Sequence, residues 1–135
     1  MNEYRILVVD DEEDLCEILK FNLENEGYEV DTANSAEDAL KMDISTYDLL
    51  LLDVMMGEIS GFKMASMLKK EKKTAKIPII FITAKDTEND TVTGFNIGAD
   101  DYISKPFSLR EVAARVKAVL RRTRQTETER APEQI

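Results

Sequence analysis

The feature that most constrains the fold is an alternation, repeated five times, of short apolar runs with segments whose apolar residues recur at helical spacing. Runs of this length are typical of buried strands, and strands that alternate with helices are typical of βα units wound into a parallel sheet. The sequence therefore predicts a three-layer, doubly wound α/β sandwich of (βα)5 type. The expected strands are residues 5–9, 29–33, 49–52, 77–82 and 101–103.

Each expected helix has an apolar face that would pack on this sheet. Gly27 and Gly98 are the expected stops of the first and fourth helices. Cys16 is the single cysteine and is interpreted as a packing residue of the first helix. In chain order, the expected faces consist of Leu15, Ile18, Leu19 and Leu23; Ala36, Ala39 and Leu40; Phe62, Ala65, Met67 and Leu68; Val92, Phe95 and Ile97; and Leu109, Val112, Ala113, Val116, Val119 and Leu120.

Composition excludes several classes of function. The net charge of −9 would repel nucleic acid over most of the surface, so we expect no DNA binding by this chain itself. The absence of histidine excludes Ser-His-Asp and Cys-His catalysis and any phosphohistidine of the chain's own. No apolar run approaches the roughly 20 residues that cross a bilayer, and the first residues lack the pattern of a signal peptide. We therefore expect a cytoplasmic protein without a membrane segment.

The length of 135 residues suits one domain. After residue 123 the apolar period is lost and Pro132 follows, as is common in linkers. We expect a domain at 1–123 and a linker or tail at 124–135.

Polar residues follow the ends of the expected strands, where packing alone does not require them. Asp10 and Asp11 follow the first strand, Asp53 follows the third, Thr83 the fourth, and Lys105 comes just after the fifth. In open parallel sheets, ligands bind beyond the carboxyl ends of the strands, near the point where strand order reverses. With the strand order 2-1-3-4-5, the three aspartates would converge at that point.

Three neighbouring carboxylates stay ionised only if a cation offsets their repulsion. Oxygen ligands without histidine favour Mg²⁺, which commonly joins protein carboxylates to a phosphate. Lys105 would supply positive charge to a transferring phosphoryl group, and the Thr83 hydroxyl would donate a hydrogen bond to it.

Simpler interpretations exist for several of these residues taken singly. The acids Glu12, Glu13 and Asp14 suit the positive end of a helix dipole and need no chemistry. Thr83 alone is typical of a strand end, and Tyr102 alone is typical of half-buried packing. It is the whole constellation that indicates a phosphate site.

The chain resembles the receiver domains of bacterial two-component response regulators over residues 4 to about 122. The motifs that carry the resemblance are ILVVDDE at 6–12, LLDVMM at 51–56, ITA at 82–84 and KPF at 105–107. It implies a flavodoxin/CheY-like fold and a sensor histidine kinase that phosphorylates Asp53. By the same resemblance, Asp10, Asp11, Asp53 and the Met55 backbone carbonyl hold Mg²⁺, Thr83 and Tyr102 form a switch pair, and Lys105 contacts the phosphate. A cis peptide between Lys105 and Pro106 is also implied.

The stretch GADDYISKPF at 98–107 is similar to the OmpR/PhoB branch, whose members usually carry a winged-helix DNA-binding domain next. The 124–135 segment would lead toward such an output domain, which this chain does not contain. The branch implies a homodimer on phosphorylation, with Asp101 and Arg115 as the preferred pair across it. Because Thr91 stands opposite Glu111, one pair usual in the branch should be missing. The expected dimer face consists of Asp100, Asp101, Glu111, Arg115 and Lys117.

Two residues depart from the branch, which commonly has proline at the place of Gly57 and aspartate at that of Ser60. Ser60 can still cap the third helix, whereas Gly57 leaves the loop less restrained. The resemblance also places Met55 and Lys85 beside the phosphoryl group, where they should hinder an attacking water.

Other functions remain open at this point. A phosphatase of the haloacid dehalogenase type needs a second acid two residues after its nucleophile, where this chain has Met55. A flavin phosphate in the loop after the first strand would face the five acids of residues 10–14. A stand-alone receiver, acting as a phosphorelay shuttle or an interaction module, is the alternative to a transcription regulator. We expect no enzymatic activity beyond acceptance and slow loss of the chain's own phosphoryl group.

Overall fold

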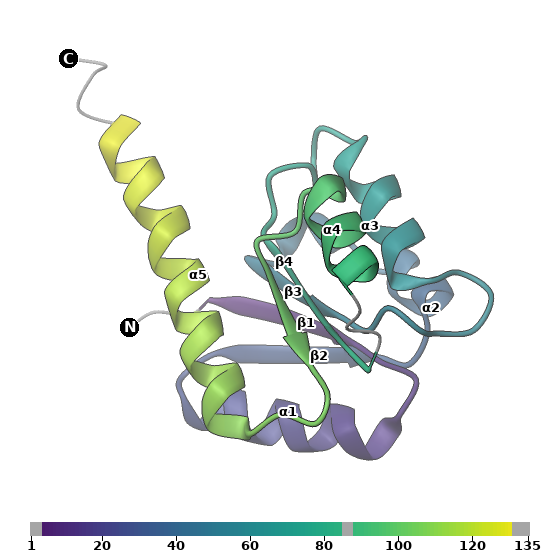
Figure 1. Cartoon of the computed structure of the whole chain (residues 1–135). Coiled ribbons are helices and arrows are strands. Elements are labelled where there is room, and N and C mark those ends of the chain that lie inside the picture. The colour runs from purple at the N-terminus through teal and green to yellow at the C-terminus, as the bar shows by residue number, and fades with distance from the viewer. Residues whose placement is uncertain (1–3, 85–87, 131–135) are drawn as a thin grey trace.

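The computed structural model describes residues 4–84 and 88–130; at 88–91, 94 and 124–130 it describes the backbone alone. A five-stranded parallel sheet lies between two layers of helices (Figure 1). The order β2-β1-β3-β4-β5 confirms the predicted topology. The strands are β1 (Arg5–Val9), β2 (Glu29–Ala33), β3 (Leu49–Leu52), β4 (Ile79–Thr83) and β5 (Asp101–Ser104).

Strand β4 is shifted by two residues at its start relative to the prediction. Pro78 has no backbone N–H to give to the sheet, and the Ile77 amide donates to the Thr74 carbonyl at 3.1 Å in the preceding turn. At its other end the strand includes Thr83, which pairs with Ser104 of β5.

Helices of the two layers cover opposite faces of the sheet (Figure 1). The helices α1 (Glu13–Asn25) and α5 (Leu109–Arg130) pack on one face, and α2 (Ala36–Leu40), α3 (Gly61–Lys69) and α4 (Glu88–Ile97) pack on the other. A short 3-10 turn, η1 (Ile44–Thr46), precedes β3. Gly27 and Gly98 follow α1 and α4 with φ of 101° and 118°, which confirms both as helix stops.

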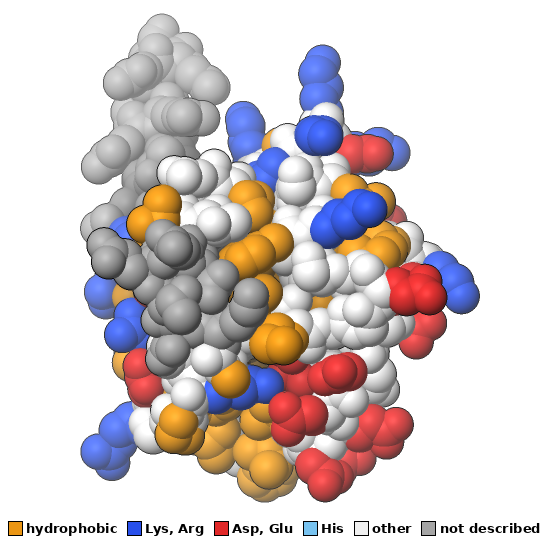
Figure 2. All heavy atoms as spheres, turned by 45° about the vertical axis from the view of Figure 1, so that its right-hand side comes forward, with side chains coloured by type: hydrophobic (Ala, Val, Ile, Leu, Met, Phe, Trp, Pro, Cys, Tyr) orange, Lys and Arg blue, Asp and Glu red, His pale blue; other side chains and the backbone are white. Residues whose placement is uncertain are grey.

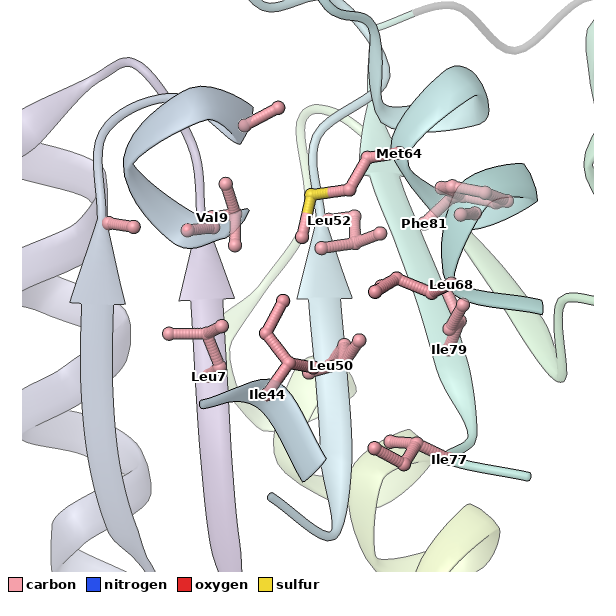
Figure 3. Close-up of a cluster of buried hydrophobic side chains, with 14 of the residues drawn as sticks. Leu7, Val9, Ile44, Leu50, Leu52, Met64, Leu68, Ile77, Ile79 and Phe81 are labelled. Carbon is pink, nitrogen blue, oxygen red and sulfur yellow. The ribbon is translucent and has the colours of Figure 1, made fainter. Parts of the chain in front are cut away.

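The central strand β3 supplies both hydrophobic clusters. Its four leucines are all buried, and they alternate between the faces of the sheet because side chains of a strand point to opposite sides. Leu50 and Leu52 join the cluster under α2 and α3, where Figure 3 shows them among Leu7, Val9 and Met64. Leu49 and Leu51 join the cluster under α1 and α5. Full burial of one leucine favours folding by ~1.5–3 kcal/mol, so this strand anchors the loop that follows it.

The predicted helix faces were wrong at four residues, because Ile18, Met67, Val92 and Phe95 are exposed. In α1 the buried line is Cys16, Leu19 and Leu23, so Ile18 lies about 100° away from Leu19 around the helix. In α3 the buried Met64 lies one turn before Leu68, and Met67 falls outside that line.

Helix α5 continues to Arg130, into the segment 124–135 expected as a linker. Arginine, glutamine and glutamate are good helix formers, and the first proline after the helix is Pro132, so loss of the apolar period did not end the helix. None of the helices in the described ranges combines the length and apolar character that a bilayer crossing requires.

Candidate functional site

Two neighbouring strands place Asp10 and Asp53 at the same edge of the sheet. Val9 pairs with Leu52 in the register of β1 and β3, so the residue after each strand emerges at the same level. The Asp53 amide donates to the Val9 carbonyl at 2.9 Å, and the Asp10 amide donates to the Ala33 carbonyl at 3.1 Å. Both side chains are almost fully enclosed, since Asp10 is 2% and Asp53 is 4% exposed.

The start of α3 fixes the backbone of Asp53 from the other side. The Gly61 amide donates to the Val54 carbonyl at 2.9 Å, which closes the loop after β3. A methyl group on Gly61 would overlap the Asp53 carbonyl oxygen, so only glycine fits this contact. Ser60 caps α3 as expected, its hydroxyl accepting from the Lys63 amide at 3.1 Å.

Lys105 brings a positive charge to the two aspartates. Its amide donates to the Thr83 carbonyl at 3.0 Å, and the peptide to Pro106 is cis, which confirms the implied isomer. The ammonium lies 3.2 Å from Asp10 Oδ2, 3.1 Å from Glu12 Oε2 and 3.8 Å from Asp53 Oδ2. One lysine therefore faces three carboxylates.

Hydrogen-bond donors surround the Asp53 carboxylate. The Met55 amide donates to Asp53 Oδ1 at 3.3 Å, and the hydroxyl of Thr83, a residue that is 1% exposed, also hydrogen-bonds to the Asp53 side chain. The Asp10 carboxylate is held similarly, because the Glu12 amide donates to its Oδ1 at 2.9 Å. Three strand ends thus contribute groups to one small site.

Burial dominates the electrostatics of the site. Burial first, and then the charge of Asp10, raises the pKa of Asp53 from 3.8 to about 6, against the opposing effect of Lys105, the Met55 amide and the Thr83 hydroxyl. Burial also raises the pKa of Asp10. Burial alone would lower the pKa of Lys105, but the carboxylates of Glu12, Asp53 and Asp10 raise it. The site therefore holds negative charge that a cation would relieve.

Carboxylate oxygens of Asp10, Asp11 and Glu12 lie within 4.8 Å of one another, as a cation site requires. Asp53 is outside this group of three, and the Lys105 ammonium lies between the Asp53 carboxylate and those of Asp10 and Glu12. Figure 2, which brings the right-hand side of Figure 1 forward, shows acidic side chains gathered over the lower part of this face. All the ligand atoms of this group are carboxylate oxygens, which suit a hard divalent cation.

Glu12 is the site residue that sequence reasoning missed. It was assigned to the helix dipole together with Glu13 and Asp14, yet its carboxylate contacts Lys105, which is 93 residues away in sequence. The only signal in the sequence was a third acid directly after Asp10 and Asp11.

Beside the aspartates, the loop after β3 lines an open hollow of about 540 Å³. Met55 lines this hollow and is exposed, two residues after Asp53 in the chain. Lys85, expected next to it, lies outside the described residues. The hollow is lined by Val54, Met55, Met56, Gly57, Ser60 and Phe62.

Thr83 and Tyr102 lie on adjacent strands but at different levels. Thr83 pairs with Ser104, whereas Tyr102 pairs with Phe81 and its ring lies 6.2 Å from the Phe81 ring, between centroids. Tyr102 is half-buried at the edge of the core beneath α4. Tyr102 is thus a diagonal neighbour of Thr83 across the two strands.

Three residues of the expected dimer face, Asp101, Glu111 and Arg115, form ion pairs within the chain. Arg115 lies 3.0 Å from Asp101 Oδ2 and 3.2 Å from Glu111 Oε2, although Asp101 and Arg115 were expected to pair across a dimer. The Asp100 carboxylate accepts from the Ile79 amide at 3.0 Å. Lys117 is exposed, and the side chain of Thr91 lies outside the described residues.

Comparison with known proteins agrees with this geometry. The family model described as a response regulator receiver domain matches residues 6–117. The chain is 50% identical over 120 residues to the alkaline phosphatase synthesis transcriptional regulatory protein PhoP of Bacillus subtilis (strain 168), across 88% of this chain and 49% of PhoP. The chain spans about half the length of the curated relatives it matches.

Solved structures show the same fold. The non-phosphorylated HemR receiver domain from Leptospira biflexa is similar with a TM-score of 0.80 and 36% identity, across 87% of this chain and 94% of that chain. DrrB of Thermotoga maritima, described as an OmpR/PhoB homologue, has a TM-score of 0.81 and 31% identity, across 90% of this chain and 54% of that chain.

Proposed function

Because the chain belongs to the response regulator receiver domain family, we propose that Asp53 accepts a phosphoryl group from the phosphohistidine of a sensor histidine kinase. The observation that carries this assignment is the enclosed Asp53 carboxylate, which is 4% exposed and has Lys105 at 3.8 Å and the Met55 amide at 3.3 Å. An enclosed carboxylate with a cation and hydrogen-bond donors around it supports the proposal that Asp53 is the nucleophile.

In the proposed transfer, a carboxylate oxygen of Asp53 attacks the phosphorus of the donor. The new P–O bond forms as the P–N bond to the donor imidazole breaks, and the electron pair stays on that nitrogen, which takes a proton from water. Lys105 and the Thr83 hydroxyl bind phosphoryl oxygens and so stabilise the charge that spreads over them. The Met55 amide orients Asp53.

Asp10, Asp11, Asp53 and the Met55 carbonyl are the proposed ligands of Mg²⁺. The donor set fits, since Asp10 and Asp11 belong to a cluster of carboxylate oxygens, Asp53 is enclosed beside Asp10, and burial and the charge of Asp10 raise the pKa of Asp53. When bound, the metal neutralises charge on the carboxylates and on the phosphoryl group. Without a cation, proton binding by Asp53 would compete with its role as a nucleophile.

The proposed output is a change at the face formed by α4, β5 and α5. Thr83 would move toward the phosphoryl group, and Tyr102 would turn inward and bias this face toward a homodimer through Asp100, Asp101, Glu111, Arg115 and Lys117. The relatives named as transcriptional regulators support a DNA-binding output on a further domain. A stand-alone relay is the alternative. We also propose a cytoplasmic location and no activity toward external substrates.

Intact-mass measurement after incubation with acetyl phosphate tests the phosphoacceptor. We expect the wild type to gain one phosphate only when Mg²⁺ is present, and Asp53→Asn to gain none. An equal gain in the variant would remove Asp53 from its proposed role.

A further inference from the structure

The position of Lys105 shows which carboxylates hold it. Its ammonium is within hydrogen-bond distance of Glu12 Oε2 at 3.1 Å and Asp10 Oδ2 at 3.2 Å. Asp53 Oδ2, at 3.8 Å, is beyond that distance. A phosphoryl group on Asp53 therefore meets a lysine that is already engaged on the Asp10 side of the site.

The Glu12 carbonyl accepts from the Cys16 amide at 3.1 Å in the first turn of α1, but the Glu12 side chain is not used to cap that helix. It is the N-cap residue of α1, with extended backbone angles, and its side chain makes no capping hydrogen bond. Its side chain is 62% exposed, whereas that of Lys105 is 18% exposed. The ion pair thus sits at the mouth of the site, with Glu12 on the solvent side.

We propose that Glu12 is a positioning residue that competes with the phosphoryl group for Lys105, an inference that rests on the proposed function of Asp53. Lys105 leaves Glu12 as the phosphoryl group arrives, because an ammonium that contacts Asp10 and Glu12 cannot also close on a phosphoryl oxygen above Asp53. The Asp10 contact is enclosed, so Glu12 is the partner that solvent can replace. Removal of the Glu12 charge therefore speeds transfer to Asp53.

The test compares Glu12→Gln with Glu13→Gln, which removes the same charge from an exposed residue in the first turn of the same helix. The rate of phosphorylation by acetyl phosphate is measured at saturating Mg²⁺. We expect Glu12→Gln to raise this rate about two- to fivefold, the range equivalent to an exposed ion pair of ~0.4–1 kcal/mol. Glu13→Gln should stay close to the wild type.

Two further measurements separate an effect through Lys105 from a general effect of charge. The increase in phosphorylation rate caused by Glu12→Gln should shrink in 0.5 M salt, since exposed ion pairs are screened. It should also vanish in a Lys105→Met background, where the double variant is compared with Lys105→Met alone. A rate that is unchanged or lower in Glu12→Gln, an equal gain in Glu13→Gln, or a gain that persists without Lys105 would overturn the proposal.

If the proposed phosphorylation of Asp53 were itself wrong, the results would differ from these. In that case the wild type would gain no phosphate or Asp53→Asn would gain the same amount, whatever residue stands at position 12.

Discussion

The ionised form of the Asp53 carboxyl lowers the stability of the folded chain. The carboxyl is enclosed beside Asp10, and its pKa is raised to about 6. An acid whose pKa is higher in the folded state binds its proton more tightly there, so its contribution to stability is present below the ordinary value of 3.8 and is lost as pH rises through about 6. A shift of about two pKa units corresponds to ~3 kcal/mol at neutral pH.

Asp53→Asn should therefore stabilise the chain in metal-free buffer. We expect the free energy of unfolding at pH 7.5 to rise by ~1–3 kcal/mol, and the gain to be clearly smaller at pH 5, where the wild-type carboxyl is largely protonated. Urea denaturation in the presence of a chelator measures both values. A gain of the same size at the two pH values would show that charge on Asp53 is not its cause.

At the level of elements, the cap of α3 decides how firmly the loop beside Asp53 is held. The Ser60 hydroxyl accepts from the Lys63 amide, and the next residue, Gly61, contacts the Asp53 backbone. Aspartate, common at this place in the OmpR/PhoB branch, would accept the same hydrogen bond.

Ser60→Ala should lower the free energy of unfolding by ~1 kcal/mol, because one amide at the start of α3 loses its partner. Ser60→Asp should remain within a few tenths of a kcal/mol of the wild type, and it serves as the matched control. Chemical denaturation at pH 7.5 compares the three proteins. Equal stability of the alanine and aspartate variants would contradict a capping role.

Much of the fold could be predicted from the sequence because local patterns carry it. The strands 5–9, 29–33 and 49–52 were predicted with their observed bounds, since each is a short buried run. Strand β4 was misplaced at its start because an apolar run does not show where Pro78 interrupts the hydrogen bonding. Ile18 was misplaced because apolar residues on a helix do not reveal which stripe meets the sheet.

The candidate site was likewise predicted only in part from the sequence. The strand ends brought Asp10, Asp53 and Lys105 together, as expected from residues that follow parallel strands. The Glu12 contact and the pairing of Arg115 within the chain depend on side-chain directions across distant elements. No periodicity in the sequence carries that information.

At the level of the whole molecule, the ion pairs between α5 and β5 and within α5 affect how a homodimer could form. Arg115 is held by Asp101 and Glu111 of its own chain, so a dimer that uses these residues must rearrange or share existing ion pairs. Each exposed ion pair contributes little free energy, so such an exchange is feasible. For the same reason we expect the dimer to be weak.

Light scattering with and without beryllofluoride, a mimic of the phosphoryl group, measures this assembly. We expect a monomer without the mimic and a dimer with it at high protein concentration, because in the proposed switch the mimic would favour one arrangement of the α4-β5-α5 face. Arg115→Glu should prevent the dimer. A monomer under both conditions, or a dimer that forms equally well in the variant, would count against this face.

Helix α5 extends beyond the body of the sheet (Figure 1), so any tilt at its base would displace its far end. Leu120 is its last buried apolar residue, and the helix continues to Arg130, ~15 Å further at 1.5 Å per residue. A tilt of about 10° at the base would sweep the far end through roughly 3 Å. A small rotation at β5 would therefore grow with distance along α5 and keep its direction, which a slack tether would not allow.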